Sequence, residues 1–134
     1  MLAAVEGRQG GRIRRSPRNR RDAALLESGD VTPKIAKFLA EQQPATPCLV
    51  VDLDVVEHNY RELARRLPLA RVFYAVKANP AAEVLNRLHR LGSNFDTASR
   101  GEIDLCLSLG VTPEKISFGN TIKKQGDIAH AYKN

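Results

Sequence analysis

The sequence predicts an α/β fold in which crossover helices join the strands of a parallel sheet. From Asp30 onward, short runs rich in β-branched and aromatic residues alternate with stretches whose apolar residues recur at helical spacing. Capping or turn residues stand at the joints between these segments. Alternation of this kind builds either a doubly wound sheet or a (β/α)8 barrel. Both folds place their chemistry at the carboxyl ends of the strands.

Residues 31–68 predict a helix, a strand and a second helix. Thr32 and Pro33 suit the N-cap and first position of a short helix, and CLVVDLD (48–54) has the composition of a strand. Asp54, with a glutamate three residues later, resembles a capping box for the second helix. Apolar residues at i, i+4, i+7 and i+11 form the stripe of this helix: Val56, Tyr60, Leu63 and Leu67.

The remaining chain repeats strand and helix three times. The predicted strands are 72–77, 94–99 and 116–119, and the predicted helices are 80–91, 99–109 and a last one from Ile122 onward. Gly92 is placed to end the first of these helices at its C′ position. Ser99 and Glu102 form a capping box for the second.

The formal net charge of +6 is concentrated at the start of the chain. Residues 1–21 contain seven arginines and one acidic residue, Glu6, and the rest of the sequence is balanced. Because this stretch has almost nothing apolar to bury, residues 1–30 are predicted to be a disordered basic tail. An RNA-binding arm and a transit peptide are the alternatives. Without interleaved aromatic residues, however, we expect no nucleic-acid partner.

Composition limits the classes of function further. A content of 43% hydrophobic and 27% charged residues is typical of a soluble chain. No apolar run reaches the roughly 18 residues of a membrane span, and the start lacks the apolar core of a signal peptide, so we expect no membrane partner and a cytoplasmic location. The two cysteines are predicted to be reduced. Neither they nor the three histidines have the spacing of a metal site.

Lys77 is the first candidate functional residue because it ends an apolar strand within RVFYAVKANP. Side-chain alternation places Phe73, Ala75 and Lys77 on one face, with Phe95 or a neighbour beside them on the next strand. If helices cover the other face, Lys77 points into a barrel mouth. A partly desolvated amine loses its proton more readily, and the neutral amine is the nucleophile that forms an imine. A lysine that merely lies at the strand edge is the alternative.

The motifs around Lys77 resemble a known family. FYAVKANP, followed by FDTASRGEI and then by ISFGN, resembles the fold-type III pyridoxal-phosphate (PLP) enzymes, in particular the ornithine/diaminopimelate/arginine decarboxylases. The likeness runs from about Thr46 to the end of the sequence. FDTAS is more similar to the ornithine and ornithine/lysine decarboxylase branch, whereas RGEI is intermediate toward the diaminopimelate branch. The resemblance implies a TIM barrel of the alanine racemase type.

The resemblance also implies a site built around pyridoxal 5′-phosphate. Lys77 becomes the Schiff-base lysine and the catalytic residue. The other cofactor-binding residues that it implies are Ala75, Asn79, Asp96 and Glu102. The two acids have simpler explanations as well, because Asp96 can accept a hydrogen bond at a strand end and Glu102 fits a capping box.

The implied activity is amino-acid decarboxylation, most simply of L-ornithine to putrescine and CO₂ at the entry to polyamine synthesis. A diaminopimelate decarboxylase or an alanine-racemase-like enzyme is one alternative. A truncated, non-catalytic homologue that binds PLP or partners is another, although the presence of Lys77 favours a catalytic parent. The partners implied are a small amino-acid substrate and, for the full-length protein, a second copy in a homodimer.

Length departs from the family pattern. A (β/α)8 barrel needs about 250 residues, and only the strands of Lys77, Asp96 and Ser117 can be counted as barrel strands. We therefore expect an amino-terminal fragment. Its residues 31–53 would form a helix and strand associated with a missing β domain, and residues 54–134 the first βα units of the barrel. Without the phosphate loop and the acidic partner of the pyridine nitrogen, the 134-residue chain alone is expected to be inactive.

Overall fold

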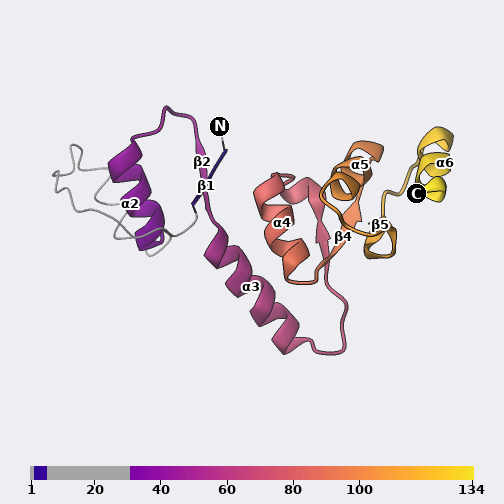
Figure 1. Cartoon of the computed structure of the whole chain (residues 1–134), viewed down its shortest axis with the longest axis horizontal. Coiled ribbons are helices and arrows are strands. Elements are labelled where there is room, and N and C mark those ends of the chain that lie inside the picture. Colours follow the sequence, from indigo (N-terminus) through magenta and orange to yellow (C-terminus); the bar gives the residue numbers. More distant parts are fainter. Residues whose placement is uncertain (1, 6–30) are drawn as a thin grey trace. The chain divides into compact units, whose positions relative to one another are not determined.

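The computed structural model describes residues 2–5 and 31–134, which belong to two compact units, 1–54 and 55–134. Figure 1 traces the elements of each unit along the chain. The predicted disorder of residue 1 and of residues 6–30 lies outside the described residues. Within the described ranges, none of the helices combines the length and the hydropathy that crossing a bilayer requires.

The first unit contains a two-stranded parallel sheet. Strand β1 (Leu2–Val5) pairs with β2 (Leu49–Asp52), and Leu2 lies opposite Leu49 in the register. The prediction of a disordered tail is therefore wrong for residues 2–5. These four residues precede the arginine-rich stretch, carry no charge, and pair along β2, which satisfies the backbone groups on one edge of the strand.

Helix α2 (Pro33–Gln42) begins as the sequence predicts. Thr32 is its N-cap, and the Oγ1 atom of Thr32 accepts a hydrogen bond of 3.2 Å from the amide of Ile35. Gln43 closes the helix in the left-handed conformation, with φ of 42°. Both ends of α2 are thus determined locally.

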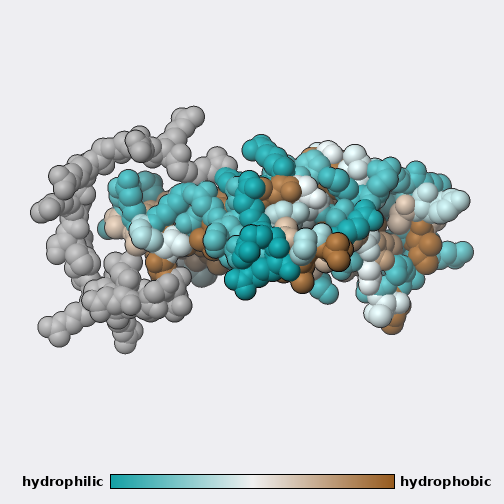
Figure 2. Space-filling view, turned by 90° about the horizontal axis from the view of Figure 1, so that it is seen from below, coloured by the Kyte–Doolittle hydropathy of each residue, from teal (hydrophilic) through white to brown (hydrophobic). Residues whose placement is uncertain are grey.

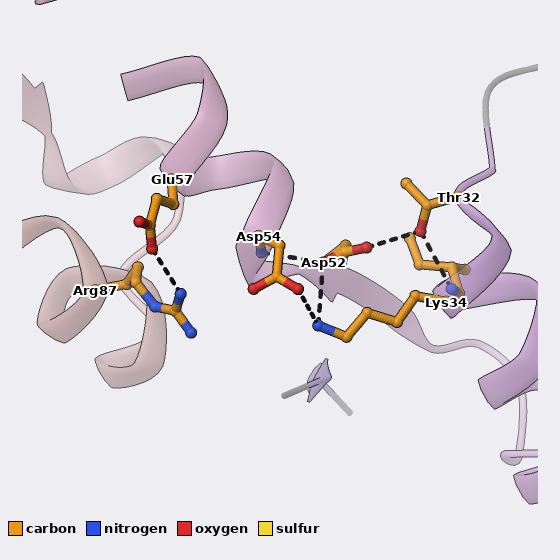
Figure 3. A network of polar contacts seen from close by, with 7 residues as sticks. Thr32, Lys34, Asp52, Asp54, Glu57 and Arg87 are labelled. Atoms are coloured by element: carbon orange, nitrogen blue, oxygen red, sulfur yellow. Dashed lines mark hydrogen bonds and ion pairs between the residues drawn. The ribbon is translucent and has the colours of Figure 1, made fainter. Parts of the chain in front are cut away.

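Helix α3 (Leu53–Arg66) begins earlier than predicted because its cap is Asp52 rather than Asp54. Asp52 Oδ1 accepts from the amide of Asp54 at 3.0 Å, and Asp52 Oδ2 accepts from Thr32 Oγ1 at 2.8 Å. The Asp54 carboxylate turns away to Lys34, whose Nζ lies 2.5 Å from Asp54 Oδ2 (Figure 3). The capping box predicted at Asp54 is therefore wrong.

The second unit contains a three-stranded parallel sheet in the order β3–β4–β5. Its strands are β3 (Phe73–Ala75), β4 (Asn94–Thr97) and β5 (Ile116–Phe118). Its helices after α3 are α4 (Ala82–Arg90), α5 (Arg100–Ser108) and α6 (Gln125–Lys133), with 3-10 turns η1 (Val76–Ala78) and η2 (Pro113–Lys115). The predicted strand–helix alternation and the parallel pairing are confirmed (Figure 1).

Gly92 ends α4 as expected, and Gly110 ends α5 in the same way. Gly92 and Gly110 have φ of 90° and 81°, in the left-handed region that glycine adopts without steric cost. Other boundaries also differ from the prediction, and two of them bear on the site or the core. Strand β3 stops at Ala75 because the chain enters η1, and α6 begins at Gln125 rather than at Ile122.

The core of the second unit lies on one face of its sheet. Tyr74, Phe95 and Ile116 are in register across the three strands. The buried apolar residues of this unit come from the sheet, from its loops and from the inner sides of α4 and α5: Val76, Val84, Leu85, Leu88, Phe95, Ile103, Cys106 and Val111. We expected Phe95 or a neighbour beside Ala75: Phe95 belongs to this core because its register partner is Tyr74, and its neighbour Asp96 is the partner of Ala75.

The opposite face of the sheet is far less covered by the described residues. Ala75, Asp96 and Ser117 are in register there, and the neighbouring Phe73 is 41% exposed. The predicted stripe of α3 is also incompletely buried, since its last two members, Leu63 and Leu67, are exposed. Apolar surface is visible between the hydrophilic residues in Figure 2.

Candidate functional site

The predicted site residues come from the carboxyl ends of β3 and β4 and from the segments that follow them. Ala75 is the last residue of β3 and lies in register with Asp96 on β4. Residues in register on parallel strands project from the same face. Ala75 and Asp96 therefore share the face opposite the buried core. Their role toward a cofactor stays a prediction.

Lys77 lies in η1, directly after β3. Its neighbour Val76 is fully buried and anchors this turn, whereas the Lys77 side chain is exposed. Among the described residues, none forms a hydrogen bond or an ion pair with Lys77 Nζ. The shielding expected for a barrel mouth is thus not supplied by the three described strands, and the amine is both accessible and unpaired.

Asn79 closes the turn between η1 and α4. Its Oδ1 atom accepts a hydrogen bond of 3.1 Å from the amide of Ala81, and its backbone oxygen accepts one of 3.3 Å from the Tyr74 hydroxyl. Burial raises the pKa of Tyr74, and the hydrogen bond to Asn79 opposes this increase. These contacts hold the segment after Lys77 in one conformation.

Glu102 takes part in the capping box of α5. Glu102 Oε2 accepts from the amide of Ala98 at 2.8 Å, and the Ser99 hydroxyl accepts from the amide of Glu102 at 3.3 Å. Ser99 Oγ also donates to Glu102 Oε1 at 3.4 Å. The predicted cap is confirmed, and it accounts for the position of both side chains. A cofactor-binding role for Glu102 stays a prediction.

Asp96 is half-buried, and its carboxylate lies against Gly119, the residue that follows β5. Sequence reasoning used ISFGN only as part of a motif and gave Gly119 no role. The available signal was the position of a glycine at a strand end, which often marks a close approach of another group to the backbone. The partner that makes this approach could be identified only from the fold.

Metal chemistry has no support among the described residues. No group of three or more His, Cys, Asp or Glu side chains within residues 2–5 and 31–134 is arranged to hold a metal ion. The closest polar pair that involves a histidine is His130 Nε2 with Asp104 Oδ1, at 2.6 Å, and it joins α6 to α5.

Comparison with known proteins relates this arrangement to a family. Residues 53–134 match the family model described as pyridoxal-dependent decarboxylase, pyridoxal binding domain. The chain belongs to this family. The resemblance noted in the motifs around Lys77 is thereby confirmed, as is the α/β fold with a parallel sheet that corresponds to the pyridoxal-binding barrel domain.

Two curated relatives and one solved protein illustrate the likeness. The lysine/ornithine decarboxylase of Selenomonas ruminantium is 47% identical over 93 residues, which are 69% of this chain and 23% of the relative. Antizyme inhibitor 2 of Xenopus laevis is 34% identical over 117 residues, 84% of this chain and 26% of the relative. The crystal structure of lysine decarboxylase from Selenomonas ruminantium superposes with a TM-score of 0.68 at 43% identity, covering 77% of this chain and 28% of that one.

The chain spans about a quarter of the length of the curated relatives it matches. The crystal structure of the Selenomonas enzyme in complex with PLP and cadaverine also has a TM-score of 0.68 to this chain. The described residues fit this cofactor. Lys77 presents an accessible amine for the cofactor's carbonyl group, and the small Ala75 leaves the adjoining face open. Pyridoxal phosphate is the cofactor of the family to which the chain belongs.

Proposed function

We propose that the natural protein containing this sequence is a PLP-dependent decarboxylase of L-ornithine, and that Lys77 is its cofactor-binding and catalytic lysine. The observation that carries the proposal is the Lys77 amine, which stands exposed and unpaired among the described residues at the end of β3, within the pyridoxal-binding domain. Once it has lost its proton, an amine without an ion-pair partner can attack a carbonyl group without first breaking a contact.

The residues around Lys77 hold its backbone in place. When bound, PLP supplies the electron sink for the pair that the departing carboxylate leaves behind. The buried Val76 anchors η1 on the core, and Asn79 fixes the following turn through Ala81. The Lys77 backbone is thus held from both sides, which leaves its side chain as the part that moves. Asp96 adds a carboxylate on the Ala75 face of the strands.

Support for ornithine comes from the motif and from one relative. FDTAS is more similar to the ornithine and ornithine/lysine branch, and the Selenomonas relative is named for both lysine and ornithine. The proposed reaction converts L-ornithine to putrescine and CO₂, which would place the protein at the entry to polyamine synthesis. L-lysine is the closest competing substrate, since it differs from ornithine by one methylene group and such a difference gives only about 10–200-fold discrimination.

The cofactor lysine is tested by chemical trapping. The natural protein is incubated with PLP, reduced with borohydride and digested, and the peptides are mapped by mass spectrometry. We expect the phosphopyridoxyl group on Lys77 in the wild type and no labelled peptide from this region in Lys77→Ala. Lys124→Arg, which alters an exposed lysine outside the strand-end site, serves as the matched control and keeps the label on Lys77. Labelling of another lysine as the main product would refute the assignment.

The reaction is tested by CO₂ release from L-ornithine, L-lysine, L-arginine and diaminopimelate in parallel. We expect the highest kcat/KM for ornithine and loss of turnover in Lys77→Ala. A higher kcat/KM for diaminopimelate would favour the other decarboxylase branch. Racemised amino acid without CO₂ would favour an alanine-racemase-like enzyme.

A non-catalytic role is the second candidate, because one relative is named antizyme inhibitor 2 rather than as a decarboxylase. The trapping experiment separates the two. A protein that forms the Lys77 adduct but releases no CO₂ from any of the four amino acids would be a PLP-binding homologue without turnover.

The assembly and compartment are part of the same proposal. We propose a homodimer in the cytoplasm, with a small amino acid as the only other partner. Sedimentation of the natural protein tests the dimer, and a fluorescent fusion that keeps its N-terminus free tests the compartment. Import into an organelle would favour the transit-peptide interpretation of residues 1–30, most of which lie outside the described residues.

A further inference from the structure

The Asp96 carboxylate occupies the space in which a side chain at position 119 would begin. A Cβ atom built on Gly119 would lie 2.1 Å from Asp96 Oδ1, 2.9 Å from Cγ and 3.1 Å from Oδ2. Favourable contacts between heavy atoms begin near 3.5 Å. Any residue other than glycine at position 119 therefore requires either the carboxylate or the backbone of β5 to move.

The backbone near Gly119 is the less free of the two. The amide of Gly119 donates to the Thr97 oxygen at 2.9 Å, and Thr97 Oγ1 donates back to the Ser117 oxygen at 2.8 Å. Thr97 is fully buried, so these bonds join β4 and β5 in a region shielded from water. A shift of β5 away from β4 would leave buried polar groups unpaired, and that is costly. The Asp96 side chain is the part that would move.

The other glycines of the described residues do not have this relationship. Gly92 and Gly110 serve helix ends with positive φ, and at Gly101 and Gly126 a Cβ would meet nothing within 4 Å. Gly119 has an ordinary backbone conformation but lacks room. Its requirement for glycine is therefore steric and directed at one side chain, that of Asp96.

We propose that Gly119 is a positioning residue, whose missing side chain allows the Asp96 carboxylate to lie over the end of β5 on the Ala75 face and beside the Lys77 turn. The inference rests on the proposed function for the role of Lys77. Asp96 lies in register with Ala75, the last residue before the Lys77 turn, and β4 runs beside η1, so the carboxylate belongs to the strand face that leads to this turn.

The steric part is tested with a double-mutant cycle in the natural protein. The variants are Gly119→Ala, Asp96→Ala and the double variant, with Gly126→Ala as the matched control in open space. In urea unfolding we expect Gly119→Ala to lower the midpoint in the wild-type background and to have no further effect in the Asp96→Ala background. The control should not lower it. An equal loss in both backgrounds would overturn the inference, because the clash would then involve another group.

The effect of Gly119 on the position of the Asp96 carboxylate needs a measurement that a mere loss of stability would leave unchanged. The visible absorbance of the PLP–protein imine is followed against pH under conditions in which every variant is folded. We expect the pH midpoint of the band to shift in the same direction in Gly119→Ala and in Asp96→Ala, because both remove the carboxylate from its place. The double variant should match Asp96→Ala, and Gly126→Ala should match the wild type.

The two proposals fail in different ways. If the wild type forms the imine but Gly119→Ala leaves its pH midpoint unchanged, the positioning role is overturned and the proposed function stands. If the wild type forms no imine at Lys77, the proposed function fails and the positioning role fails with it. The steric coupling of Gly119 and Asp96 is then still decided by the unfolding cycle.

Discussion

Arg87 Nη1 lies 2.8 Å from Glu57 Oε2, and this ion pair joins α4 to α3 within the second unit (Figure 3). Glu57 also binds Arg61 on its own helix, with Oε1 2.8 Å from Arg61 Nη2. The hydrogen bond from Arg87, followed by that from Arg61, lowers the pKa of Glu57 below its usual value. Part of the apolar stripe of α3 stays exposed, and the Glu57–Arg87 pair is a polar contact between α3 and α4.

We expect Glu57→Gln to make the stability of the fold depend less on pH in the acid range. The folded-state pKa of Glu57 is depressed, so its contribution is present above the unfolded pKa of about 4.5 and is lost as the pH falls through the folded value. Urea midpoints measured from pH 7 to pH 3 should therefore fall more steeply for the wild type than for Glu57→Gln. The difference should shrink in high salt.

Glu41→Gln is the control for this measurement, because Glu41 forms only a long, exposed pair with Lys37 at 4.0 Å. Its urea midpoints should follow those of the wild type. Parallel curves for Glu57→Gln and the wild type would show that the contact between Glu57 and Arg87 contributes nothing measurable to folding.

Two variants separate the role of Glu102 in the helix cap from the role of its charge. Ser99→Ala removes the hydroxyl that accepts from the amide of Glu102 and should cost about 1 kcal/mol of folding free energy. Glu102→Gln keeps a side-chain oxygen for the amide of Ala98 but removes the charge, so its stability should stay close to the wild type. If Glu102 lies in the cofactor pocket, Glu102→Gln alone should alter the absorbance of the PLP imine.

The opposite pattern would contradict a cofactor role for Glu102. A Glu102→Gln protein with an unchanged imine band and a loss of stability as large as that of Ser99→Ala would show that Glu102 is a cap and nothing more.

The two cysteines should differ sharply in reactivity. Burial, together with the nearby charge of Glu102, raises the pKa of the Cys106 thiol to about 11, whereas Cys48 is only half-buried. Since the thiolate is the nucleophile, an alkylating reagent at pH 7 should label Cys48 in the folded protein and Cys106 only after unfolding. Rapid labelling of Cys106 under native conditions would show that α5 opens readily.

The same shift predicts an alkaline loss of stability. In the unfolded chain the Cys106 thiol ionises near pH 9, and in the folded chain near pH 11. Between these values the unfolded state binds fewer protons, so stability decreases as the pH rises. Cys106→Ser should reduce this alkaline slope, although it also introduces a hydroxyl into the core and lowers the stability at neutral pH. Cys48→Ser is the matched control and should keep the slope.

Local signals correctly predicted one end of each of the helices α2, α4 and α5. Thr32 caps α2, Ser99 and Glu102 cap α5, and Gly92 ends α4, as their sequence patterns indicated. Each of these features depends on a side chain or a φ angle within a few residues of the helix end. Nothing distant is needed to produce them, which is why the sequence was sufficient.

Relationships between strands were harder to predict. Asp52 takes the cap position expected of Asp54, whose carboxylate pairs with Lys34 of α2 instead. Phe95 lies on the core face because the register pairs it with Tyr74, and a shift of one residue would have reversed its direction. Both outcomes depend on which distant segments pack together, and local sequence patterns do not reveal those contacts.

Residues 1–134, produced alone, should form neither a stable two-state domain nor a decarboxylase. Within the described residues, β3 and β5 each pair only with β4, so both outer edges of the sheet present unpaired backbone groups that invite association. Large apolar side chains are left in water as well, among them Phe73 at 41%, Ile122 at 86% and Tyr132 at 93% exposure.

A few such exposed side chains are enough to decide whether the chain is stable on its own. Fully burying one of them is worth about 1.5–3 kcal/mol, and the whole margin of a folded domain is about 5–15 kcal/mol. We therefore expect a broad urea transition, association in size-exclusion chromatography, and CO₂ release from L-ornithine no faster than with free PLP. Lys77→Ala in the same chain is the control for any residual turnover. A sharp, cooperative transition of a monomer would show that the three strands suffice for a fold. Turnover above that of free PLP and lost in Lys77→Ala would show that the strand-end site is already complete.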